Sequence, residues 1–353
     1  MSHDFPLALS FDDVLLIPRY SDINSRSEVD LTSQISSKLT LKNPIISTKM
    51  DTVTGVKMAS TLGKLGGMGI LPRFESVDSQ ADKVNKVKKT NVPVAAAVGV
   101  KDGFLERAQS LVNAGVDALD IDVAHGHMRK TIEATRIVKE KFGRKVTILS
   151  GIAATYECAR DLYKAGADSL LVGIGASPIC ITRVVTGFGL PSISSLLEVA
   201  KAAKEYKKTF MPDSGIKNSG DVVKALATGA SAVVCGFLLA GIDETPGKIV
   251  TRNGLKYKTY NGSTSLTEKD KHVKIDSSDK NGNYITQIEG VESLVDYKGP
   301  LAIYMENVLA GVRSGLAYAG ARNIQELWKK AKFVRITSQG MRESVPHDVL
   351  LNN

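Results

Sequence analysis

The stretch Ala165-Gly-Ala-Asp-Ser-Leu-Leu171 joins the end of an amphipathic segment to a short apolar run. Two other stretches repeat its pattern, Ala114-Gly-Val-Asp-Ala-Leu-Asp120 and Thr228-Gly-Ala-Ser-Ala-Val-Val234. In each stretch a glycine caps a helix, and the chain turns straight into the next strand. Three copies of one helix-to-strand joint indicate an internal repeat of strand–helix units.

Strands and helices alternate on both sides of these joints. Short apolar runs predict strands at residues 44–47, 67–71, 92–98, 117–122, 146–149, 168–172, 209–211 and 231–234. Helical patterns lie between and after them, at residues 53–64, 78–89, 103–114, 129–142, 154–165, 192–207 and 219–228. Eight buried strands with helical crossovers predict an α/β fold, the (β/α)8 TIM barrel. A doubly wound sheet would need a Gly-x-Gly-x-x-Gly after an early strand, and the sequence has none there.

Three segments lie outside the repeat. Residues 1–42 form an N-terminal arm, and residues 301–330 are expected to form one or two closing helices. Residues 244–298 are polar and rich in Gly, Asn, Ser and Lys, with little helical period from Ser263 to Gly282. So long an excursion is either a disordered insert or an active-site flap. Because it leaves from the face where barrel sites lie, we expect a flap on one catalytic domain over residues 1–353.

Composition bounds the class of protein. The chain has 353 residues, of which 43% are hydrophobic and 24% are charged, so a sizeable core is expected. No run of about 18 apolar residues occurs, and Met1-Ser-His-Asp-Phe-Pro6 lacks the features of a secretory signal. We therefore expect no membrane span and a cytoplasmic location. The net charge of +9 is scattered along helix faces without a nucleic-acid motif, which favours a phosphorylated small molecule as the partner.

The three cysteines, Cys158, Cys180 and Cys235, are odd in number and widely spaced, which argues against a disulfide framework or a zinc site. Cys180 lies between two Gly-x-Gly pairs, Gly173-Ile-Gly175 and Gly187-Phe-Gly189, after the sixth strand. Glycines let the backbone bend on both sides of a nucleophile. A mobile loop carrying a reactive thiol is one interpretation, and a buried cysteine in a tight turn is the other.

Polar residues and glycines follow several strands at the end where a barrel carries its site. Asp122 and Asp213 could accept hydrogen bonds from ribose hydroxyls or could cap helices. Gly215 and Gly236, after the seventh and eighth strands, suit either a phosphate held by backbone N–H groups or a tight turn. His125-Gly-His127 could supply two metal ligands, but no histidine further along the chain follows a barrel strand.

Several longer motifs are spread over nearly the whole chain. They are Leu9-Ser-Phe-Asp-Asp-Val-Leu-Leu-Ile-Pro18, Met50-Asp-Thr-Val-Thr54, Asp122-Val-Ala-His-Gly-His127, the loop from Gly173 to Thr182, Ser219-Gly-Asp-Val-Val-Lys-Ala-Leu226 and the tail from Phe333 to Asp348. Together these motifs resemble those of the IMP dehydrogenase and GMP reductase family. The resemblance implies an oxidoreductase of purine nucleotides on a TIM barrel, usually a homotetramer. The tail and Ala124-His-Gly-His127 resemble the dehydrogenase branch.

In this family a cysteine attacks C2 of the purine ring of IMP, hydride passes to NAD, and water hydrolyses the thioimidate to give XMP. The resemblance gives the attack to Cys180 and the water step to Thr182 and Glu289. It assigns the nucleotide to Ser47, Met50, Asp213, Gly215, Gly236, Tyr260 and Gly262. It assigns NAD or NADP to Asp122, Val123 and Ala124. Backbone carbonyls of Gly175, Ser177 and Cys180 match the family's monovalent-cation site, usually potassium.

Some positions depart from the family pattern. Dehydrogenases usually carry CBS regulatory modules before the third barrel strand, but Val87-Lys-Lys-Thr-Asn-Val-Pro93 runs straight on, so we expect none. The two serines that face the phosphate are replaced by Pro178 and Phe237. The usual Asp-Gly-Gly is Asp213-Ser214-Gly215, and the flap's base-facing Met-Gly is Ser263-Thr264.

The flap also lacks the Arg-Tyr pair that activates water in dehydrogenases, since no arginine lies between Arg252 and Arg313. Lys271-His272 or Tyr284 could take its place. GMP reductases lack this pair as well, so reduction of GMP by NADPH to IMP and ammonia stays open as an alternative. A diverged family member with an altered purine ligand is the third possibility.

Overall fold

The computed structural model describes residues 5–275, 286–347 and 349. The strands of its main sheet are β4 (Ile45–Ser47), β5 (Met68–Leu71), β6 (Val94–Val98), β7 (Ala118–Asp122), β8 (Thr147–Ala153), β9 (Ser169–Val172), β10 (Thr209–Pro212) and β11 (Val233–Cys235). The helices between them are α1 (Val56–Lys64), α2 (Val77–Lys88), α3 (Phe104–Asn113), α4 (Arg129–Phe142), α5 (Tyr156–Lys164), α6 (Thr182–Thr186), α7 (Ser192–Tyr206) and α8 (Ser219–Ala227). Within the described ranges, no helix combines the length and the apolar composition that a membrane span requires.

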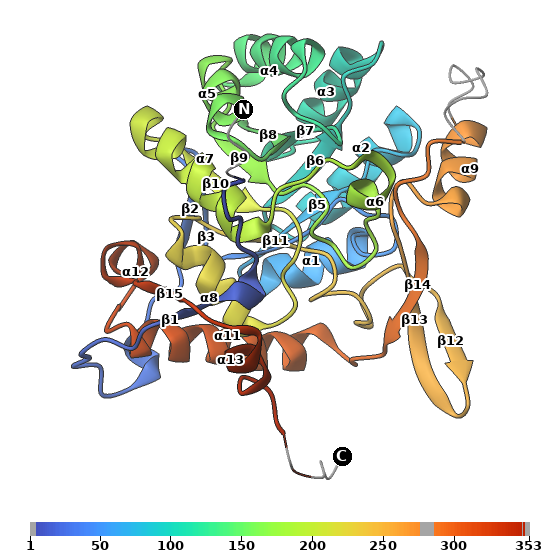
Figure 1. Cartoon of the computed structure of the whole chain (residues 1–353). Coiled ribbons are helices and arrows are strands. Elements are labelled where there is room, and N and C mark those ends of the chain that lie inside the picture. Colours follow the sequence, from blue (N-terminus) through green and yellow to red (C-terminus); the bar gives the residue numbers. More distant parts are fainter. Residues whose placement is uncertain (1–4, 276–285, 348, 350–353) are drawn as a thin grey trace.

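The eight strands form one parallel sheet in the order β10-β9-β8-β7-β6-β5-β4-β11, surrounded by the helices (Figure 1). A parallel bridge between Asp213 and Val234 joins the end of β10 to β11, so the sheet closes on itself. The (β/α)8 barrel predicted from the repeated joint is confirmed. α2 ends at Lys88 and β6 begins at Val94, so only a short turn joins them.

Alternation along each strand decides which side chains enter the barrel. On β7, Ala118 belongs to the interior core, whereas Leu119 and Ile121 pack against the outer helices. The same alternation turns Asp120 and Asp122 toward the interior. A carboxylate that must stay inside a barrel needs a partner, and this requirement shapes the site described below.

The N-terminal arm contains η1 (Phe11–Asp13), β1 (Val14–Leu16), η2 (Arg26–Glu28), β2 (Ser33–Ser36) and β3 (Leu39–Leu41). β2 and β3 pair as an antiparallel hairpin, and its Ile35, Leu39 and Leu41 join the interior core of the barrel. The hairpin therefore closes the N-terminal mouth of the barrel. The chain ends with α11 (Leu301–Tyr318), α12 (Ile324–Lys330), β15 (Phe333–Arg335) and α13 (Ser338–Arg342), and β15 pairs with β1. Residues 301–330 thus form two closing helices, as expected.

The polar excursion after β11 is built around a three-stranded antiparallel sheet of β12 (Ile249–Arg252), β13 (Leu255–Asn261) and β14 (Glu292–Asp296). A helix, α9 (Leu266–Ile275), follows β13. This helix forms in a stretch where the sequence shows little helical period. Its Glu268, Lys269 and His272 are buried, so polar contacts hold it rather than the apolar stripe that sequence periodicity detects.

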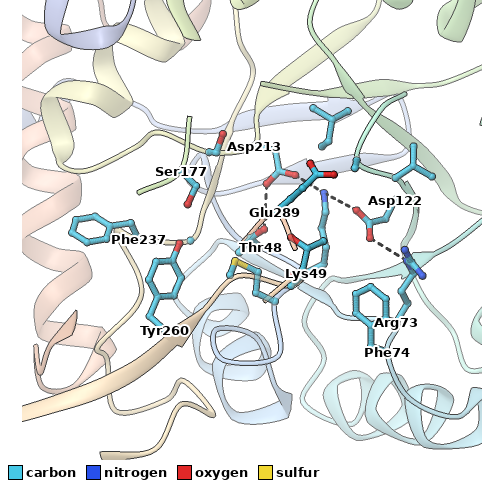
Figure 2. Close-up of a pocket in the computed structure, with 18 of the residues that line it drawn as sticks. Thr48, Lys49, Arg73, Phe74, Asp122, Ser177, Asp213, Phe237, Tyr260 and Glu289 are labelled. Atoms are coloured by element: carbon cyan, nitrogen blue, oxygen red, sulfur yellow. Dashed lines mark hydrogen bonds and ion pairs between the residues drawn. The ribbon is translucent and has the colours of Figure 1, made fainter. Parts of the chain in front are cut away.

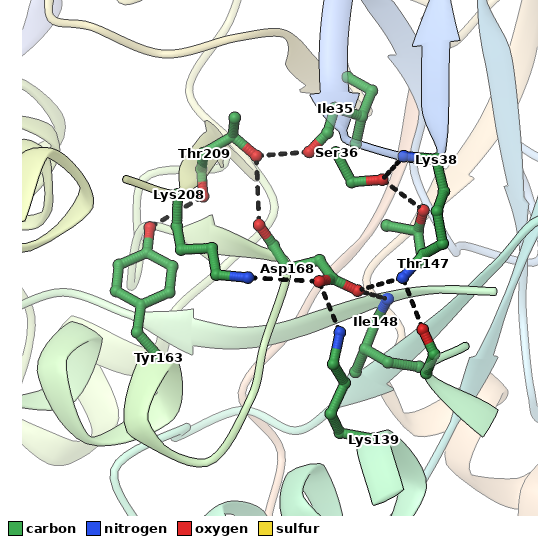
Figure 3. A network of polar contacts seen from close by, with 11 residues as sticks. Ile35, Ser36, Lys38, Lys139, Thr147, Ile148, Tyr163, Asp168, Lys208 and Thr209 are labelled. Carbon is green, nitrogen blue, oxygen red and sulfur yellow. Dashed lines mark hydrogen bonds and ion pairs between the residues drawn. The ribbon is translucent and has the colours of Figure 1, made fainter. Parts of the chain in front are cut away.

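The two ends of the barrel differ in character. The C-terminal ends of the strands surround a cavity (Figure 2). At the opposite end, three lysines converge on the buried carboxylate of Asp168 (Figure 3). Lys139 donates to Asp168 at 2.6 Å, and the backbone N–H of Ile148 donates at 3.0 Å. Burial alone would raise the pKa of Asp168, but these hydrogen bonds and the charges of Lys139 and Lys38 hold it below its usual range.

Contacts of the same kind are found at the helix-to-strand joint that contains Asp117. The carboxylate of Asp117 accepts from Lys88 on α2 and from the backbone N–H of Val94 on the neighbouring strand, each at 2.8 Å. In two of the three repeats, the aspartate of the joint therefore accepts hydrogen bonds from a lysine on a neighbouring helix and from a backbone N–H of the strand that follows that helix. Asp117 is more exposed than Asp168, with 30% against 6% of its side chain accessible, so its contacts are screened more.

We expect Asp168→Asn to lower the free energy of unfolding by about 2 kcal/mol at pH 7, because the buried carboxylate loses its charge-assisted hydrogen bonds to the partly exposed lysines. The folded-state pKa of Asp168 is depressed, so its contribution is present above the ordinary value of 3.8 and is lost as the pH falls through the folded value. Urea unfolding at pH 7 and at pH 3 measures both effects. The more exposed Asp117→Asn is the control and should lose less. An equal loss for Asp168→Asn at the two pH values would contradict this account.

Candidate active site

A cavity of about 390 Å³ opens at the C-terminal ends of the strands, a size typical of small-molecule sites (Figure 2). Ten residues expected from the sequence line it: Met50, Asp122, Val123, Ala124, Ser177, Asp213, Gly215, Gly236, Tyr260 and Glu289. The excursion supplies Ser263, Thr264, Lys269, Gln287 and Glu289 to the wall. The structure therefore favours the active-site flap over the disordered insert for the described part of residues 244–298.

Lys49 reaches across the floor of the cavity and contacts carboxylates from two other strands (Figure 2). Its ammonium donates to Asp213 and lies 3.3 Å from Asp120 and 3.6 Å from Asp122. In the closed strand order, β7 lies three strands from β4 on one side, and β10 lies two strands from β4 on the other. One lysine therefore fixes carboxylates that face each other across the site.

Burial and charge compete in this cluster. Burial alone would lower the pKa of Lys49, but the carboxylates of Asp120, Asp213 and Asp122 outweigh it and hold the pKa well above its usual range. Burial raises the pKa of Asp120 to about 7 in spite of Lys49. Burial would also raise the pKa of Asp122, but Lys49 and Arg73 outweigh it and lower that pKa. Of the carboxylates in the cluster, Asp120 is therefore the one that burial most favours in its protonated form.

The two carboxylates expected to meet ribose hydroxyls keep fixed orientations. Thr48 donates to one carboxylate oxygen of Asp213 at 3.2 Å, and Lys49 donates to the other oxygen. Arg73 donates to Asp122 at 3.1 Å, and its guanidinium lies 4.3 Å from the centre of the Phe74 ring. Both carboxylates still reach the cavity wall. They are therefore available as acceptors for a bound sugar.

Ser47 differs from its expected place. On β4, Ile46 belongs to the interior core and Ile45 to the outer one, so alternation turns Ser47 outward. Its hydroxyl accepts from Thr54 at 2.8 Å in the layer between strand and helix. The next residue, Thr48, lines the cavity in its place. The assignment of Ser47 to the nucleotide therefore stays a prediction, and Thr48 is the residue at this strand end that faces the cavity.

Gly262 also lies behind the cavity wall. A Cβ at this position would come within 3.0 Å of the Cα of Gly290 and 3.3 Å of the carbonyl oxygen of Ile179. Its backbone N–H donates to the carbonyl of Val291 at 3.0 Å. The glycine therefore permits close packing inside the flap, whereas Ser263 and Thr264 after it reach the cavity.

The three residues expected to carry catalysis form one hydrogen-bonded chain. The sulfur of Cys180 lies 3.2 Å from the hydroxyl oxygen of Thr182. That hydroxyl lies 2.7 Å from a carboxylate oxygen of Glu289, to which it donates. Glu289 lines the cavity, and Ser177 and the following Pro178 line it on the other side of the loop. The thiol of Cys180 therefore lies next to the cavity but is not one of the groups that line it.

Cys180 is half-buried, whereas Cys158 and Cys235 are buried. Burial raises the pKa of Cys158 to about 12 and raises that of Cys235 further. A thiolate is the reactive form of cysteine, so the two buried thiols are poor nucleophiles. All three cysteines are free, which agrees with the expectation of reduced thiols.

The Cys180 loop pairs with the flap like a short strand. Cys180 and Gly290 form an antiparallel bridge, the N–H of Ile181 donates to Glu289 at 2.9 Å, and the N–H of Val291 donates to Ile179 at 3.0 Å. These contacts place Glu289 beside Thr182. The loop that carries the thiol and the segment that carries the carboxylate therefore hold each other in position.

Arg183 closes the base of the loop. Its guanidinium donates to the carbonyl of Ile174 at 3.0 Å and to that of Leu190 at 2.8 Å. A Cβ at Gly175 or at Gly189 would lie 2.6 Å from the Cγ of Arg183. One glycine of each Gly-x-Gly pair is thus needed to leave room for the side chain of Arg183. The sequence alone did not show this reason for the two glycines.

The opposite end of the cavity is aromatic. The rings of Phe237 and Tyr260 are tilted, with their centres 6.3 Å apart. Burial raises the pKa of Tyr260 to about 12, so its hydroxyl stays protonated and can donate. A Cβ at Gly236 would lie 2.6 Å from that hydroxyl oxygen, so only glycine fits there. Lys298 sits behind Phe237 and donates to its carbonyl at 3.0 Å, and burial lowers the pKa of Lys298 to about 8.

Lys271 and His272, two of the alternatives for the missing Arg-Tyr pair, are not among the residues that line the cavity. Lys271 contacts Glu268 at 2.9 Å, and the ring of His272 stacks on Phe74. Tyr284 lies outside the described residues. Lys269 faces the cavity instead, and its ammonium donates to the carbonyl of Gln287.

His127 contacts Asp161 at 3.0 Å, and within the described part of the chain neither it nor His125 belongs to a cluster of three potential metal ligands. Sequence reasoning also missed Lys49, Arg73, Phe74 and Lys269. A charged residue directly after a barrel strand was the available signal for Lys49. No local pattern marks the other three, because their positions depend on contacts between distant segments.

We expect Lys49→Met to lower the free energy of unfolding by about 3 kcal/mol at pH 8, because it leaves buried carboxylates without their counter-ion. The loss should be smaller at pH 6, where Asp120, with a pKa of about 7, carries a proton. Urea unfolding at the two pH values gives the comparison. Adding Asp120→Asn to the variant should restore part of the loss at pH 8. If Lys49→Met loses the same free energy of unfolding at both pH values, and Asp120→Asn restores none of it, then Lys49 does not stabilise the protein through the charge cluster.

Three comparisons agree on the family. Residues 8–347 match the family model described as "IMP dehydrogenase / GMP reductase domain". The inosine-5′-monophosphate dehydrogenase of Nitrosopumilus maritimus is 33% identical over 477 aligned positions, covering 99% of this chain and 100% of that protein. That of Aquifex aeolicus is 33% identical, covering 97% of this chain and 95% of that protein. A GMP reductase from Trypanosoma brucei, solved in complex with guanosine 5′-monophosphate, matches with a TM-score of 0.93 and 27% identity over 99% of each chain. The chain belongs to the IMP dehydrogenase and GMP reductase family of oxidoreductases.

Proposed function

We propose that the protein oxidises IMP to XMP with NAD, using Cys180 as the nucleophile. The observation that carries the proposal is the hydrogen-bonded chain Cys180–Thr182–Glu289 at the edge of the cavity. The relatives that are 33% identical over nearly their full lengths carry the name of this activity. The reaction is IMP + NAD⁺ + H₂O → XMP + NADH + H⁺.

The thiol has a defined task in this reaction. C2 of the purine ring can release hydride only after a nucleophile has made it tetrahedral. The sulfur of Cys180 forms a bond to C2, hydride leaves C2, and a thioimidate remains on the enzyme. NAD⁺ supplies the acceptor for that hydride. Since the sulfur lies behind the cavity wall, the loop must shift slightly for attack, and its glycines permit this.

Thr182 and Glu289 serve the second half of the reaction. Water must lose a proton as it attacks the thioimidate, and a carboxylate within hydrogen-bond reach can accept that proton. The hydroxyl of Thr182 lies between the sulfur and Glu289, so it can relay a proton between them. Water then replaces sulfur at C2, and Cys180 is released as the thiol.

The remaining residues bind and orient. Asp213 faces the cavity with both oxygens fixed by Lys49 and Thr48, which suits the ribose hydroxyls of the nucleotide. Gly215, Gly236 and the hydroxyl of Tyr260 are assigned to its phosphate, and Met50 to its base. Asp122, Val123 and Ala124 line the wall at the end of β7, and the carboxylate fits the ribose of a dinucleotide.

Three further assignments remain predictions from the family. The carbonyls of Gly175, Ser177 and Cys180 belong to one loop and are oxygen donors, a set that suits potassium. The carbonyl of Ser177 already accepts from the N–H of Cys180 at 3.1 Å, which fixes its direction. The other two predictions from the family are a homotetramer and a cytoplasmic location.

GMP reduction is the second candidate. The structural match to a GMP reductase bound to guanosine 5′-monophosphate favours it, and the same Cys180, Thr182 and Glu289 could serve the release of ammonia. The two activities are separated by one pair of assays, NADH formation from IMP and NAD and NADPH consumption with GMP. We expect the first to proceed. Activity only in the second would overturn the dehydrogenase assignment and keep the family chemistry.

Replacing the nucleophile should stop the reaction. We expect Cys180→Ala to reduce NADH formation at least about a thousandfold, because hydride cannot leave C2 without the adduct. The thermal unfolding temperature should not change, since the side chain is half-buried in a loop. Cys158→Ala, which removes a buried thiol on α5, is the matched control and should retain turnover. Normal turnover by Cys180→Ala would exclude covalent catalysis.

Replacing the carboxylate should separate the two half-reactions. In Glu289→Gln the thiol can still attack, so the first turnover should give a burst of NADH followed by a steady state that is at least about tenfold slower. Stopped-flow absorbance measures both phases. Glu292→Gln serves as the control, because Glu292 contacts Thr267 rather than Thr182. Loss of the burst in Glu289→Gln would place the carboxylate in the hydride step instead.

A further inference from the structure

Three potential metal ligands meet on the outer side of the cavity wall. Asp51 follows Met50 at the end of β4, and Glu268 and His272 lie one turn apart on α9. One ligand atom from each residue lies within 4.8 Å of the other two. Residues from the barrel and from the flap are therefore brought to one point.

The separation of Asp51 and His272 fits an ion between them. The Nε2 of His272 lies 3.7 Å from a carboxylate oxygen of Asp51, which is too long for a direct hydrogen bond. Two ligand atoms at about 2.1 Å from a tetrahedral metal ion lie about 3.4 Å apart. Small side-chain rotations would bring the pair to that spacing.

Glu268 supplies the second observation. Its side chain is 2% exposed, and one of its oxygens accepts from Asn261 at 3.0 Å and from Lys271 at 2.9 Å. The other oxygen is buried and has no hydrogen-bond partner among the described residues. A buried carboxylate oxygen without a partner is costly, and a cation would satisfy it.

The imidazole is already oriented. The rings of His272 and Phe74 are stacked, with their centres 3.5 Å apart and their planes 9° apart. Phe74 itself lines the cavity. The ring can therefore present a nitrogen to an ion without first being ordered, which reduces the entropy cost of binding.

We propose that Asp51, Glu268 and His272 form a binding site for a divalent transition-metal ion that fastens α9 to the barrel. One imidazole and two carboxylates suit Zn²⁺, Mn²⁺ or Fe²⁺, whereas Mg²⁺ and Ca²⁺ prefer oxygen ligands alone. The ion's charge of +2 would face two carboxylates, of which Glu268 already contacts Lys271 through its other oxygen. It would hold the flap closed over the cavity. Thr264, just before α9, and Lys269, on α9, both line the cavity wall. This role lies outside the redox reaction, and its test requires no turnover.

Calorimetric titration of metal-stripped protein with Zn²⁺ tests the site. We expect one ion per chain with a Kd in the micromolar range or tighter, and a loss of affinity of at least about 100-fold in Glu268→Gln, His272→Ala and Asp51→Asn. Circular dichroism confirms that each variant is folded. His127→Ala is the matched control, because His127 also contacts a carboxylate, Asp161, but belongs to no such cluster of three among the described residues.

Hydrogen exchange gives a second, independent measurement. In the wild-type protein, Zn²⁺ should slow exchange of the α9 amides at least about tenfold, with no such change in His272→Ala. Mg²⁺ at the same concentration should not slow it. The proposal is overturned if Zn²⁺ binds no more tightly than about 1 mM, if all three variants bind as the wild type does, or if binding is lost only in Cys180→Ala.

Discussion

The ammonium of Lys49 determines the shape of the cavity floor. Strand alternation turns Asp120 and Asp122 inward from β7 and Asp213 inward from the end of β10, and carboxylates inside a barrel repel one another unless a cation lies between them. Lys49 follows β4, which lies three strands from β7 on one side and two strands from β10 on the other. Its one charge therefore decides where Asp122 and Asp213 stand, and these are the residues assigned to the two ribose rings.

The catalytic chain is built on a different principle. Cys180 and Glu289 are far apart in the sequence, and a backbone bridge between Cys180 and Gly290 brings them together. The flap that carries Glu289 also supplies Lys269 and Gln287 to the cavity wall. The same segment thus forms part of the cavity wall and completes the proposed catalytic chain.

The barrel was accessible from the sequence because its signals are local. Each joint of the Ala165-Gly-Ala-Asp168 type contains its own helix cap, and alternation within a strand repeats every second residue. The motif around Cys180 was likewise local, and Thr182 is two residues away. Ser47 was assigned to the nucleotide through the family resemblance, which carries no information on which face of the three-residue strand β4 its side chain takes.

What the sequence could not show depends on contacts between distant segments. Over residues 266–273, where burial is described, the buried side chains of α9 are the polar Glu268, Lys269 and His272 rather than an apolar stripe. The stacking of His272 on Phe74 and the three contacts of Lys49 follow from the register of the closed barrel and the path of the flap. Such contacts become visible only when the whole chain is folded.

Covalent bonding between the substrate and Cys180 is the central claim, and mass spectrometry of protein quenched in acid during turnover tests it most directly. With IMP and NAD present, the account predicts a purine nucleotide adduct on the peptide that contains Cys180, at a level that rises when Glu289 is replaced by Gln. Turnover without any adduct, or an adduct carried by Cys158 or Cys235, would contradict it.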